Sequence, residues 1–205
     1  MITLYHLNKS RSKRIIWLLE ELGVDYQIEA FQRDKDTSLA PDALKAIHPL
    51  GKSPVIKDGD LVVAESGAIT EYLIEKYAAD RLAPARGSAD YVQYLQWIHF
   101  AESSAMVPLL LKMFLQKDGA KTNFLQDYAD GEALKVLTYL SQQLDGRRYL
   151  VGDTLSGADI MVYFVVDAVE QSGALAFFPV LESYLKQLRT HPNCQKAEQL
   201  EAELG

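Results

Sequence analysis

The sequence holds a single cysteine, Cys194, among its 205 residues, so no disulfide can form within the chain. Structural disulfides belong to oxidising compartments, and their exclusion makes a reducing cytoplasm the natural setting. The N-terminal residues MITLYHL lack the basic-then-apolar order of a secretory signal. We also expect charged residues to interrupt every apolar run before it reaches membrane-spanning length, so no membrane association is predicted.

Basic residues are outnumbered, 21 to 28, by acidic ones, which gives a formal net charge of -7. This balance argues against nucleic-acid binding, which requires a basic face. A small anionic ligand stays compatible, because local charge can oppose the global sign. One segment carries Lys9, Arg11, Lys13 and Arg14 with no acidic residue among them. Basic charge at a helix start opposes the helix dipole, which favours a bound anion over a plain solvated helix start.

The first part of the chain predicts a mixed sheet with helices. Two alternating segments flank an apolar helical stripe, and this strand–helix–strand unit is the size of a right-handed unit with parallel strands. A tight turn at Asp58-Gly59 then joins two short apolar strands into an antiparallel hairpin. The order is β-α-β-α-β-β-α with four strands. The expected segments are strands at 2–6 and 26–31, a helix ending at Gly23, a short helix at 41–47, the hairpin around Asp58-Gly59, and a helix capped by Ser66.

The remainder predicts helices, with a strand-like pattern only at Tyr149–Val151. We therefore expect an α/β domain over residues 1–79, a linker at 80–87 containing Pro84, and an all-α domain over 88–205. The expected helices cover 88–116, kinked or split at Pro108, then 123–144, 156–170 and 178–189, and a last short segment towards the C-terminus.

Asp159 lies at the start of an almost entirely apolar helix that belongs at the centre of a bundle. One interpretation makes it a catalytic carboxylate. The other makes it a structural cap, because Ser156 and Asp159 are three residues apart, as in a capping box with Asp in place of Glu. The spacing favours the structural interpretation.

The stretch from residue 48 to residue 69 holds the candidate binding site. Proline at a strand start has no N–H to donate, and an X–Pro bond is the one place where a cis peptide is cheap. A cis Ser53–Pro54 bond would turn the N–H and C=O of Ser53 outward, where they could pair with an extended peptide. Lys52 is adjacent and could meet a carboxylate.

A second clamp is expected at Glu65-Ser66, where a strand leads into a helix. The Ser66 hydroxyl and the helix N–H groups can hold a carboxylate, and Glu65 can hold an ammonium group. Taken singly, these features are explained as well by a turn proline and a helix cap. Together and in this order, they predict a site for a small zwitterionic peptide with an acid at each end.

A wider set of segments carries a family resemblance: Tyr5-His6, Ser10-Arg11-Ser12, Arg14, Trp17–Gly23, His48–Val55, Glu65–Ile69 and Leu155–Ile160. Together they resemble the cytosolic glutathione transferase family, most of all its bacterial and fungal enzymes with a serine near the first helix. The resemblance covers essentially the whole chain.

The resemblance implies a thioredoxin-like glutathione-binding domain followed by a helical bundle. In the family, the proline matching Pro54 is cis, and the residue matching Ser53 pairs with the cysteinyl backbone of glutathione. Glu65 and Ser66 would hold the γ-glutamyl end of glutathione, and Lys52 would contact its glycyl carboxylate.

The resemblance also places catalysis at the start of the first helix. Ser10 would hydrogen-bond the glutathione sulfur, with Ser12 as runner-up, Arg11 as a source of positive charge and Tyr5 as a further alternative. The thiolate is the nucleophile, and a hydroxyl donor together with a helix N-terminus favours this anion. Ser10 is equally explained as a plain helix N-cap. Because no cysteine stands there, the disulfide-forming subclasses do not fit.

The second substrate is expected to be a small hydrophobic electrophile in the cleft between the domains. Candidate lining residues are Met106, Leu110 and Phe114, although their helical spacing is also that of an ordinary core stripe. No metal is expected, because His99 and Glu102 share a helical face but two ligands do not make a metal site.

The sequence thus predicts a glutathione transferase that acts on a small electrophile in detoxification, with glutathione peroxidase activity as an addition. The alternatives are a non-catalytic glutathione-binding carrier or interaction protein, and a glutathione-dependent disulfide reductase. The resemblance further implies a homodimer. A self-complementary patch for it could come from four tyrosines, Tyr72, Tyr77, Tyr91 and Tyr94.

Overall fold

A computed structural model describes residues 1–78, 80–119 and 121–205, and its chain divides into two compact units. One unit comprises Met1–Ala83 together with Arg189–Gly205, and the other comprises Pro84–Leu188. The end expected for the first domain, residue 79, lies outside the described residues. The chain end was expected in the helical domain, whereas the structure joins Arg189–Gly205 to the first unit.

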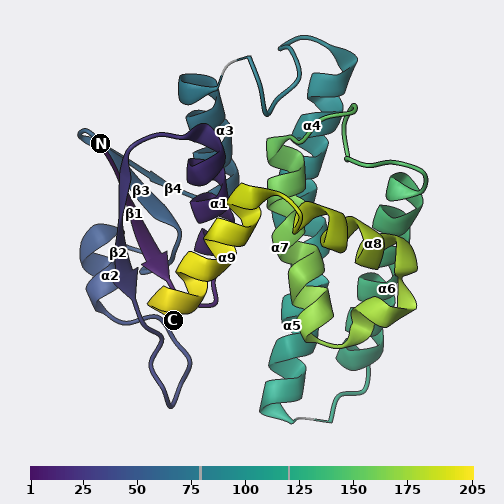
Figure 1. Ribbon diagram of the computed structural model, residues 1–205. Helices are drawn as coiled ribbons and strands as arrows, with labels where there is room; N and C mark the ends of the chain where they lie inside the picture. The colour runs from purple at the N-terminus through teal and green to yellow at the C-terminus, as the bar shows by residue number, and fades with distance from the viewer. Residues whose placement is uncertain (79, 120) are drawn as a thin grey trace. The chain divides into compact units, whose positions relative to one another are not determined.

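The sheet of the first unit has four strands in the order β2-β1-β3-β4 (Figure 1). β1 pairs parallel with β2 and antiparallel with β3, and β3 pairs antiparallel with β4. The predicted mixed four-stranded sheet and its hairpin are therefore confirmed. The strands are β1 (Ile2–Leu7), β2 (Tyr26–Phe31), β3 (Val55–Asp58) and β4 (Leu61–Ala64).

The described residues of the first unit form four helices, and α1 is the most deeply buried of them. Its residues from Ile15 to Leu19 are fully buried, and it ends at Gly23, whose positive φ of 68° suits glycine. This burial explains the unbroken run of apolar residues from Ile15 to Leu19 in this helix. The helices are α1 (Ser12–Leu22), α2 (Ala43–Ile47), α3 (Ser66–Tyr77) and α9 (Pro192–Leu204).

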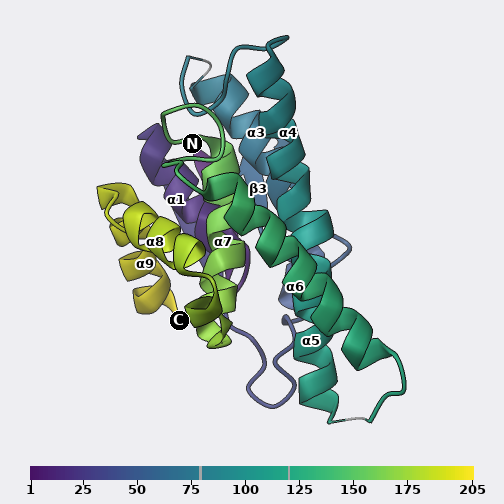
Figure 2. The same ribbon diagram turned by 90° about the vertical axis from the view of Figure 1, so that its right-hand side faces the viewer.

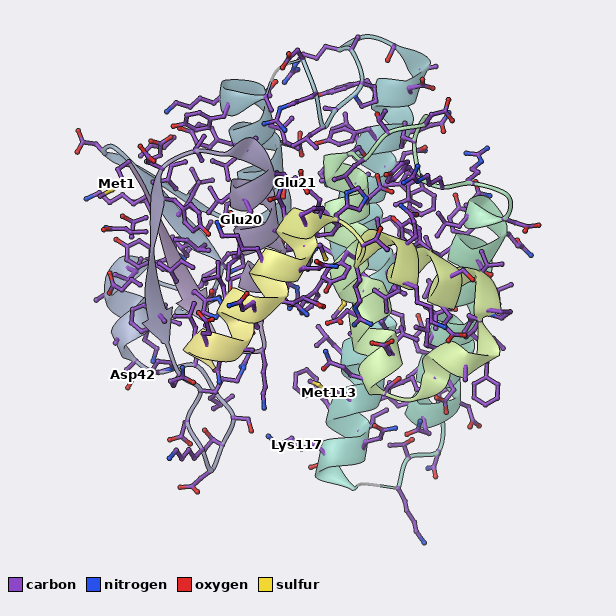
Figure 3. All side chains as sticks on the ribbon, viewed as in Figure 1. Met1, Glu20, Glu21, Asp42, Met113 and Lys117 are labelled. Atoms are coloured by element: carbon purple, nitrogen blue, oxygen red, sulfur yellow. The ribbon has the colours of Figure 1, made fainter. Side chains whose placement is uncertain are left out.

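The last helix, α9, packs against α1, and Figure 1 shows the yellow α9 beside the purple α1. Cys194 and Ala197 form its buried face. An ion pair of 2.6 Å joins Lys196 to Glu20, which Figure 3 labels on α1 near α9. These contacts are the physical reason why the chain end belongs to the first unit.

The second unit consists of helices, as predicted, and Figure 2 shows α5 and α6 side by side. Tyr149–Val151 forms bends rather than a strand, so that part of the prediction is wrong. A short 3-10 helix, η2, was not foreseen. The elements are α4 (Ala89–Phe100), the π-helix η1 (Ala101–Ala105), α5 (Met106–Asp118), α6 (Leu125–Leu144), α7 (Gly157–Gln171), η2 (Ala174–Phe177) and α8 (Pro179–Leu188).

The long helical run is split just before Pro108, at the π-helix η1. Proline has no N–H for the carbonyl one turn earlier, and its ring collides with that carbonyl. A wider π turn directly upstream relieves this conflict without ending the helix. The predicted interruption is thus confirmed, with the break on the N-terminal side of the proline.

Within the described residues, the run Ala89–Asp118 is long and apolar enough to cross a membrane by length and composition alone, with a mean hydropathy of 1.3. The expectation that charges would interrupt every such run was wrong, because Glu102 is the only Asp, Glu, Lys or Arg residue between Tyr91 and Leu111. A single run of this kind is weak evidence for a membrane span, since core helices of other proteins pass the same test.

The centre of the second unit is α7, and Asp159 caps its start. The carboxylate of Asp159 accepts hydrogen bonds of 2.9 Å from both the backbone N–H and the hydroxyl of Ser156, and the capping box is formed. It also accepts from the Leu150 N–H at 2.9 Å and the Tyr184 hydroxyl at 2.7 Å. Burial raises the pKa of Asp159, and the four hydrogen bonds oppose the rise. The structural interpretation of this residue is confirmed.

Candidate functional site

The candidate binding residues gather at one end of the sheet because of its register. β3 and β4 pair Val55 with Ala64, so the residues just before Val55 and just after Ala64 are neighbours. These are Pro54 and Glu65. β1 pairs Tyr5 with Val55, which brings the C-terminal end of β1 and the chain beyond it to the same end.

The first clamp is built on Ser53, and the predicted cis Ser53–Pro54 bond is confirmed. The Ser53 hydroxyl donates to the Tyr5 carbonyl at 2.8 Å and accepts from the Leu7 N–H at 3.1 Å, so β1 fixes this residue. Among the described residues, the N–H and C=O of Ser53 form no backbone–backbone hydrogen bond. Lys52, the next residue towards the N-terminus, is exposed.

The second clamp lies where β4 leads into α3. Glu65 occupies the N-cap position with φ 68° and ψ 116°, a backbone conformation that costs energy for any residue but glycine. Its side chain is exposed. Ser66 is the first helical residue and is buried, so the expectation that Ser66 itself would be the cap is off by one position. Strain of this kind persists where a fixed geometry serves a function.

The start of α1 carries a compact group of hydroxyls. Ser10 Oγ lies 2.7 Å from Ser12 Oγ and accepts from the Ser12 N–H at 3.2 Å. Ser12 is fully buried, and its hydroxyl contacts His6 Nδ1 at 2.7 Å and donates to the Leu7 carbonyl at 3.2 Å. Ser10 keeps 6% of its surface exposed. Ser10 is therefore at the outer end of the group. Its hydroxyl also accepts the hydrogen bond from the N–H of Ser12, the first residue of α1.

His6 has two polar neighbours within the first unit. Its Nδ1 faces Ser12, and its Nε2 lies 3.3 Å from Oε2 of Glu201 on α9. Burial lowers the pKa of His6 to about 4, so the imidazole is neutral at pH 7. No sequence pattern indicates Glu201 as a partner of His6, because only the packing of α9 in the first unit brings it here.

The basic residues of the segment 9–14 differ in exposure and in partners. Arg14 is fully buried, and Lys13 pairs with Glu198 at 3.4 Å. Arg11 occupies the N-cap position of α1 without a side-chain capping bond and is half-buried. Of the four, Lys9 is the one whose side chain is largely exposed.

Tyr5 lies on the opposite face of β1 from His6, because successive side chains of a strand alternate. His6 shares its face with the hydroxyl group of Ser12. The strand geometry therefore points the Tyr5 ring away from the Ser10–Ser12 group.

The three candidate electrophile-pocket residues differ in exposure, although all are on α5. Met106 is 4% exposed and belongs to the core of the second unit, Leu110 is half-buried, and Phe114 is 57% exposed. A shallow hollow near the C-terminal end of α5 is lined by Leu111, Phe114, Leu115, Lys117 and Asp118. Figure 3 labels Lys117 there.

Two of the four tyrosines considered for a dimer patch are engaged within the first unit. Tyr72, Tyr77 and Lys76 all donate to Oδ2 of Asp58, at 2.9, 2.6 and 2.7 Å. Burial raises the pKa of Asp58, but these hydrogen bonds outweigh burial and hold the pKa at about 2. Tyr94 is buried, so it cannot contribute an exposed ring.

Metal ligands do not gather anywhere in residues 1–78, 80–119 and 121–205, where no group of three or more His, Cys, Asp or Glu side chains could hold an ion.

Two family profiles match the chain. Residues 1–75 match the glutathione S-transferase N-terminal domain, and residues 106–198 match the glutathione S-transferase C-terminal domain. Together they span most of the sequence, and they agree with the sheet-containing first unit and the helical second unit.

Individual relatives agree with the profiles. Glutathione S-transferase 3 of Schizosaccharomyces pombe is 31% identical over 188 residues, which cover 83% of this chain and 75% of the relative. The crystal structure of a glutathione S-transferase from Actinobacillus pleuropneumoniae has a TM-score of 0.91 and 35% identity, and covers 98% of this chain and 93% of that one. A sphingomonad glutathione S-transferase, solved in complex with glutathione, has a TM-score of 0.79 and 26% identity over 98% of both chains. With the fold and both family profiles in agreement, the chain belongs to the glutathione S-transferase family of enzymes.

Proposed function

We propose that this enzyme binds glutathione along residues 52–66, ionises its thiol at Ser10 and directs the thiolate to a small hydrophobic electrophile. The observation that carries the proposal is the position of Ser10. It stands at the outer end of a buried hydroxyl group, at the same end of the sheet as both clamps. A hydroxyl there can donate to an anionic sulfur, and such charge-assisted hydrogen bonds are the strong ones.

The two clamps support glutathione as the ligand. The free backbone groups of Ser53 suit the cysteinyl peptide group, and Lys52 suits the glycyl carboxylate. The Ser66 hydroxyl and helix N–H groups suit the γ-glutamyl carboxylate, and the exposed Glu65 carboxylate suits the ammonium group. The sphingomonad relative was solved with glutathione bound, which agrees with this ligand.

The test of this proposal combines binding with turnover. The wild-type enzyme is expected to be retained on immobilised glutathione and to conjugate a chlorinated nitroaromatic compound. Lys52→Ala and Glu65→Gln should each raise the KM for glutathione about tenfold with kcat nearly unchanged, because they remove charged contacts common to ground and transition states.

Lys57→Ala is the matched control, because Lys57 is an exposed lysine nearby on β3 with no role in the clamps. It should leave the KM unchanged. Retention without turnover of the nitroaromatic, a hydroperoxide or a mixed disulfide would favour a glutathione-binding carrier. Turnover of the mixed disulfide alone would favour a reductase. An unchanged KM in both clamp variants would contradict the binding mode.

The electrophile site is proposed to include Leu110 and Phe114, with Met106 behind them. The support is the exposed aromatic ring of Phe114, which offers apolar surface to a hydrophobic compound. Hydroperoxides are the proposed second substrate class, since the same thiolate can attack oxygen as well as carbon. An enzyme of this kind would serve detoxification in a reducing cytoplasm, where the buried Cys194 stays a thiol.

We further propose a homodimer. β4 is an edge strand, and Leu61 and Val62 on it are 48% and 44% exposed; Val92 on α4 is also exposed. Exposed edges and apolar side chains of this kind favour association. Light scattering is expected to give twice the 23.0 kDa of one chain, and Val62→Glu should shift the mass towards that of one chain. A wild-type mass of one chain would contradict the dimer.

A further inference from the structure

A chain of four polar side chains runs inward from Ser10 within the first unit. Ser10 Oγ is 2.7 Å from Ser12 Oγ, and Ser12 Oγ is 2.7 Å from His6 Nδ1. On the far side of the ring, His6 Nε2 is 3.3 Å from Glu201 Oε2, an ion-pair distance at which the two atoms do not have hydrogen-bond geometry. The Lys9 N–H donates to Glu201 Oε1 at 2.8 Å and so holds the carboxylate for this contact.

The Ser10–Ser12 and Ser12–His6 contacts each need one hydrogen between their heavy atoms. Which residue donates in each hydrogen bond therefore depends on the protonation of His6. In the neutral ring with hydrogen on Nε2, the Nδ1 lone pair takes the single hydroxyl hydrogen of Ser12 at 2.7 Å, in place of the longer contact of 3.2 Å with the Leu7 carbonyl. Ser12 Oγ then accepts the hydroxyl hydrogen of Ser10. In this direction Ser10 offers a ligand only lone pairs, so it can accept from a thiol but cannot donate to a thiolate.

We propose that this chain is a proton path, in which the glutathione thiol proton passes through Ser10 and Ser12 to Nδ1 of His6, and Glu201 stabilises the resulting imidazolium. His6 and Glu201 are then positioning residues that act on the sulfur through the hydroxyls. The proposal rests on the proposed contact between Ser10 and the sulfur.

Every hydrogen in this step is accounted for. The S–H bond breaks and its proton goes to Ser10 Oγ, while the hydrogen of Ser10 passes to Ser12 and that of Ser12 to His6 Nδ1. The thiol loses one proton and the ring gains one, so no further reactant is needed. After the transfer, His6 donates a hydrogen bond to Ser12, and Ser12 donates one to Ser10. Ser10 in turn donates a hydrogen bond to the thiolate.

The surrounding charges fit this sequence of events. The buried ring starts neutral, with its pKa at about 4, so Nδ1 is able to accept. The Glu201 carboxylate on α9 and the new thiolate then both favour the charged ring, as a carboxylate does in the Ser-His-Asp arrangement. Catalytic contacts such as that between His6 Nε2 and Glu201 Oε2 are often long in the free enzyme and shorten when the substrate binds. Arg33 interacts electrostatically with Glu201 and Arg11, and the buried Arg14 follows Ser12 by two positions on α1.

The experiment measures the apparent pKa of glutathione bound to the enzyme, from the ultraviolet absorbance of the thiolate, beside kcat/KM across pH. Glu201→Gln keeps the acceptor for Lys9 but removes the charge. His6→Asn keeps a polar atom near Ser12 but cannot take a proton. Each variant is expected to raise the thiol pKa by about one unit, which lowers kcat/KM about tenfold at pH values below that pKa. The loss should vanish at high pH.

Glu198→Gln is the matched control, because Glu198 lies on the same helix but pairs with Lys13 and Arg189 rather than with His6. It should leave the thiol pKa unchanged. If Ser10→Ala leaves this pKa at the wild-type value, the proposed role of Ser10 fails. If Ser10→Ala raises it while Glu201→Gln and His6→Asn behave like the control, only the proton path fails. If kcat/KM of Glu201→Gln and His6→Asn is lowered equally at all pH values, their role is merely structural, and the proton path is also overturned.

A second measurement uses the wild-type enzyme, so its outcome does not depend on whether the variants fold. Nitrogen-15 NMR of the histidine rings distinguishes a neutral imidazole from an imidazolium. Glutathione is expected to convert His6 to the imidazolium, whereas S-methylglutathione, which has no thiol proton, should leave it neutral. A neutral His6 ring beside a fully formed glutathione thiolate would overturn the proposal.

Discussion

Replacement of Ser10 by alanine is expected to lower kcat/KM for the chlorinated nitroaromatic about 100-fold, the size of effect seen when one preorganised donor to a developing anion is removed. Ser10 Oγ sits at the outer end of the buried hydroxyl group, where its hydrogen can reach a bound sulfur. Without it, the thiol pKa returns towards its ordinary value of about 8.5, and less thiolate is present at pH 7. Glutathione affinity should change little, because both clamps remain.

Two comparison variants separate Ser10 from its rivals. Ser12→Ala should cost less, about tenfold, because Ser12 is buried and acts through Ser10. Tyr5→Phe should have little effect, because Tyr5 lies on the other face of β1 from the hydroxyl group. Steady-state kinetics and isothermal titration with glutathione provide both readouts. Full turnover in Ser10→Ala, together with loss in Ser12→Ala or Tyr5→Phe, would show that the sulfur contact is assigned to the wrong residue.

Replacement of Asp159 by alanine is expected to lower the free energy of unfolding by about 4 kcal/mol, as for other losses of a buried, multiply hydrogen-bonded charge. The carboxylate is fully buried, and its removal leaves the N–H groups of Leu150 and Ser156 and the hydroxyl of Tyr184 without this acceptor. Urea unfolding followed by circular dichroism measures the change.

Tyr184→Phe removes one of these hydrogen bonds and should cost about 1 kcal/mol. Asp153→Ala, at an exposed position before α7, should change stability by less than about 0.5 kcal/mol. If Asp159→Ala were as stable as Asp153→Ala but had lost turnover, the catalytic interpretation of this carboxylate would have to be restored.

Local patterns were sufficient to predict most of the fold. The alternation of the first strands, the Asp58-Gly59 turn and Gly23 each act over a few residues, so the sheet, its hairpin and the end of α1 could be predicted from the sequence. The packing of α9 on α1 could not, because an amphipathic helix does not indicate which neighbour it covers. The π turn before Pro108 was missed in detail, since proline signals a conflict without fixing how the backbone resolves it.

The candidate site also has parts that follow from local sequence and parts that only tertiary packing creates. Its clamps lie on one hairpin and the helix after it, so Ser53-Pro54 and Glu65-Ser66 are near neighbours by local chain geometry and could be predicted. The strained backbone of Glu65 could not, because nothing in its sequence neighbourhood requires a positive φ. The contact of His6 with Glu201 joins the two ends of the chain, and only tertiary packing creates it.

A crystal structure of the enzyme with bound glutathione tests the central claim most directly. We expect the sulfur within hydrogen-bond distance of Ser10 Oγ, the glycyl carboxylate at Lys52, the cysteinyl backbone on Ser53, and the γ-glutamyl end at Glu65 and Ser66. A sulfur that contacts the Tyr5 hydroxyl, with Ser10 turned away from the ligand, would contradict it.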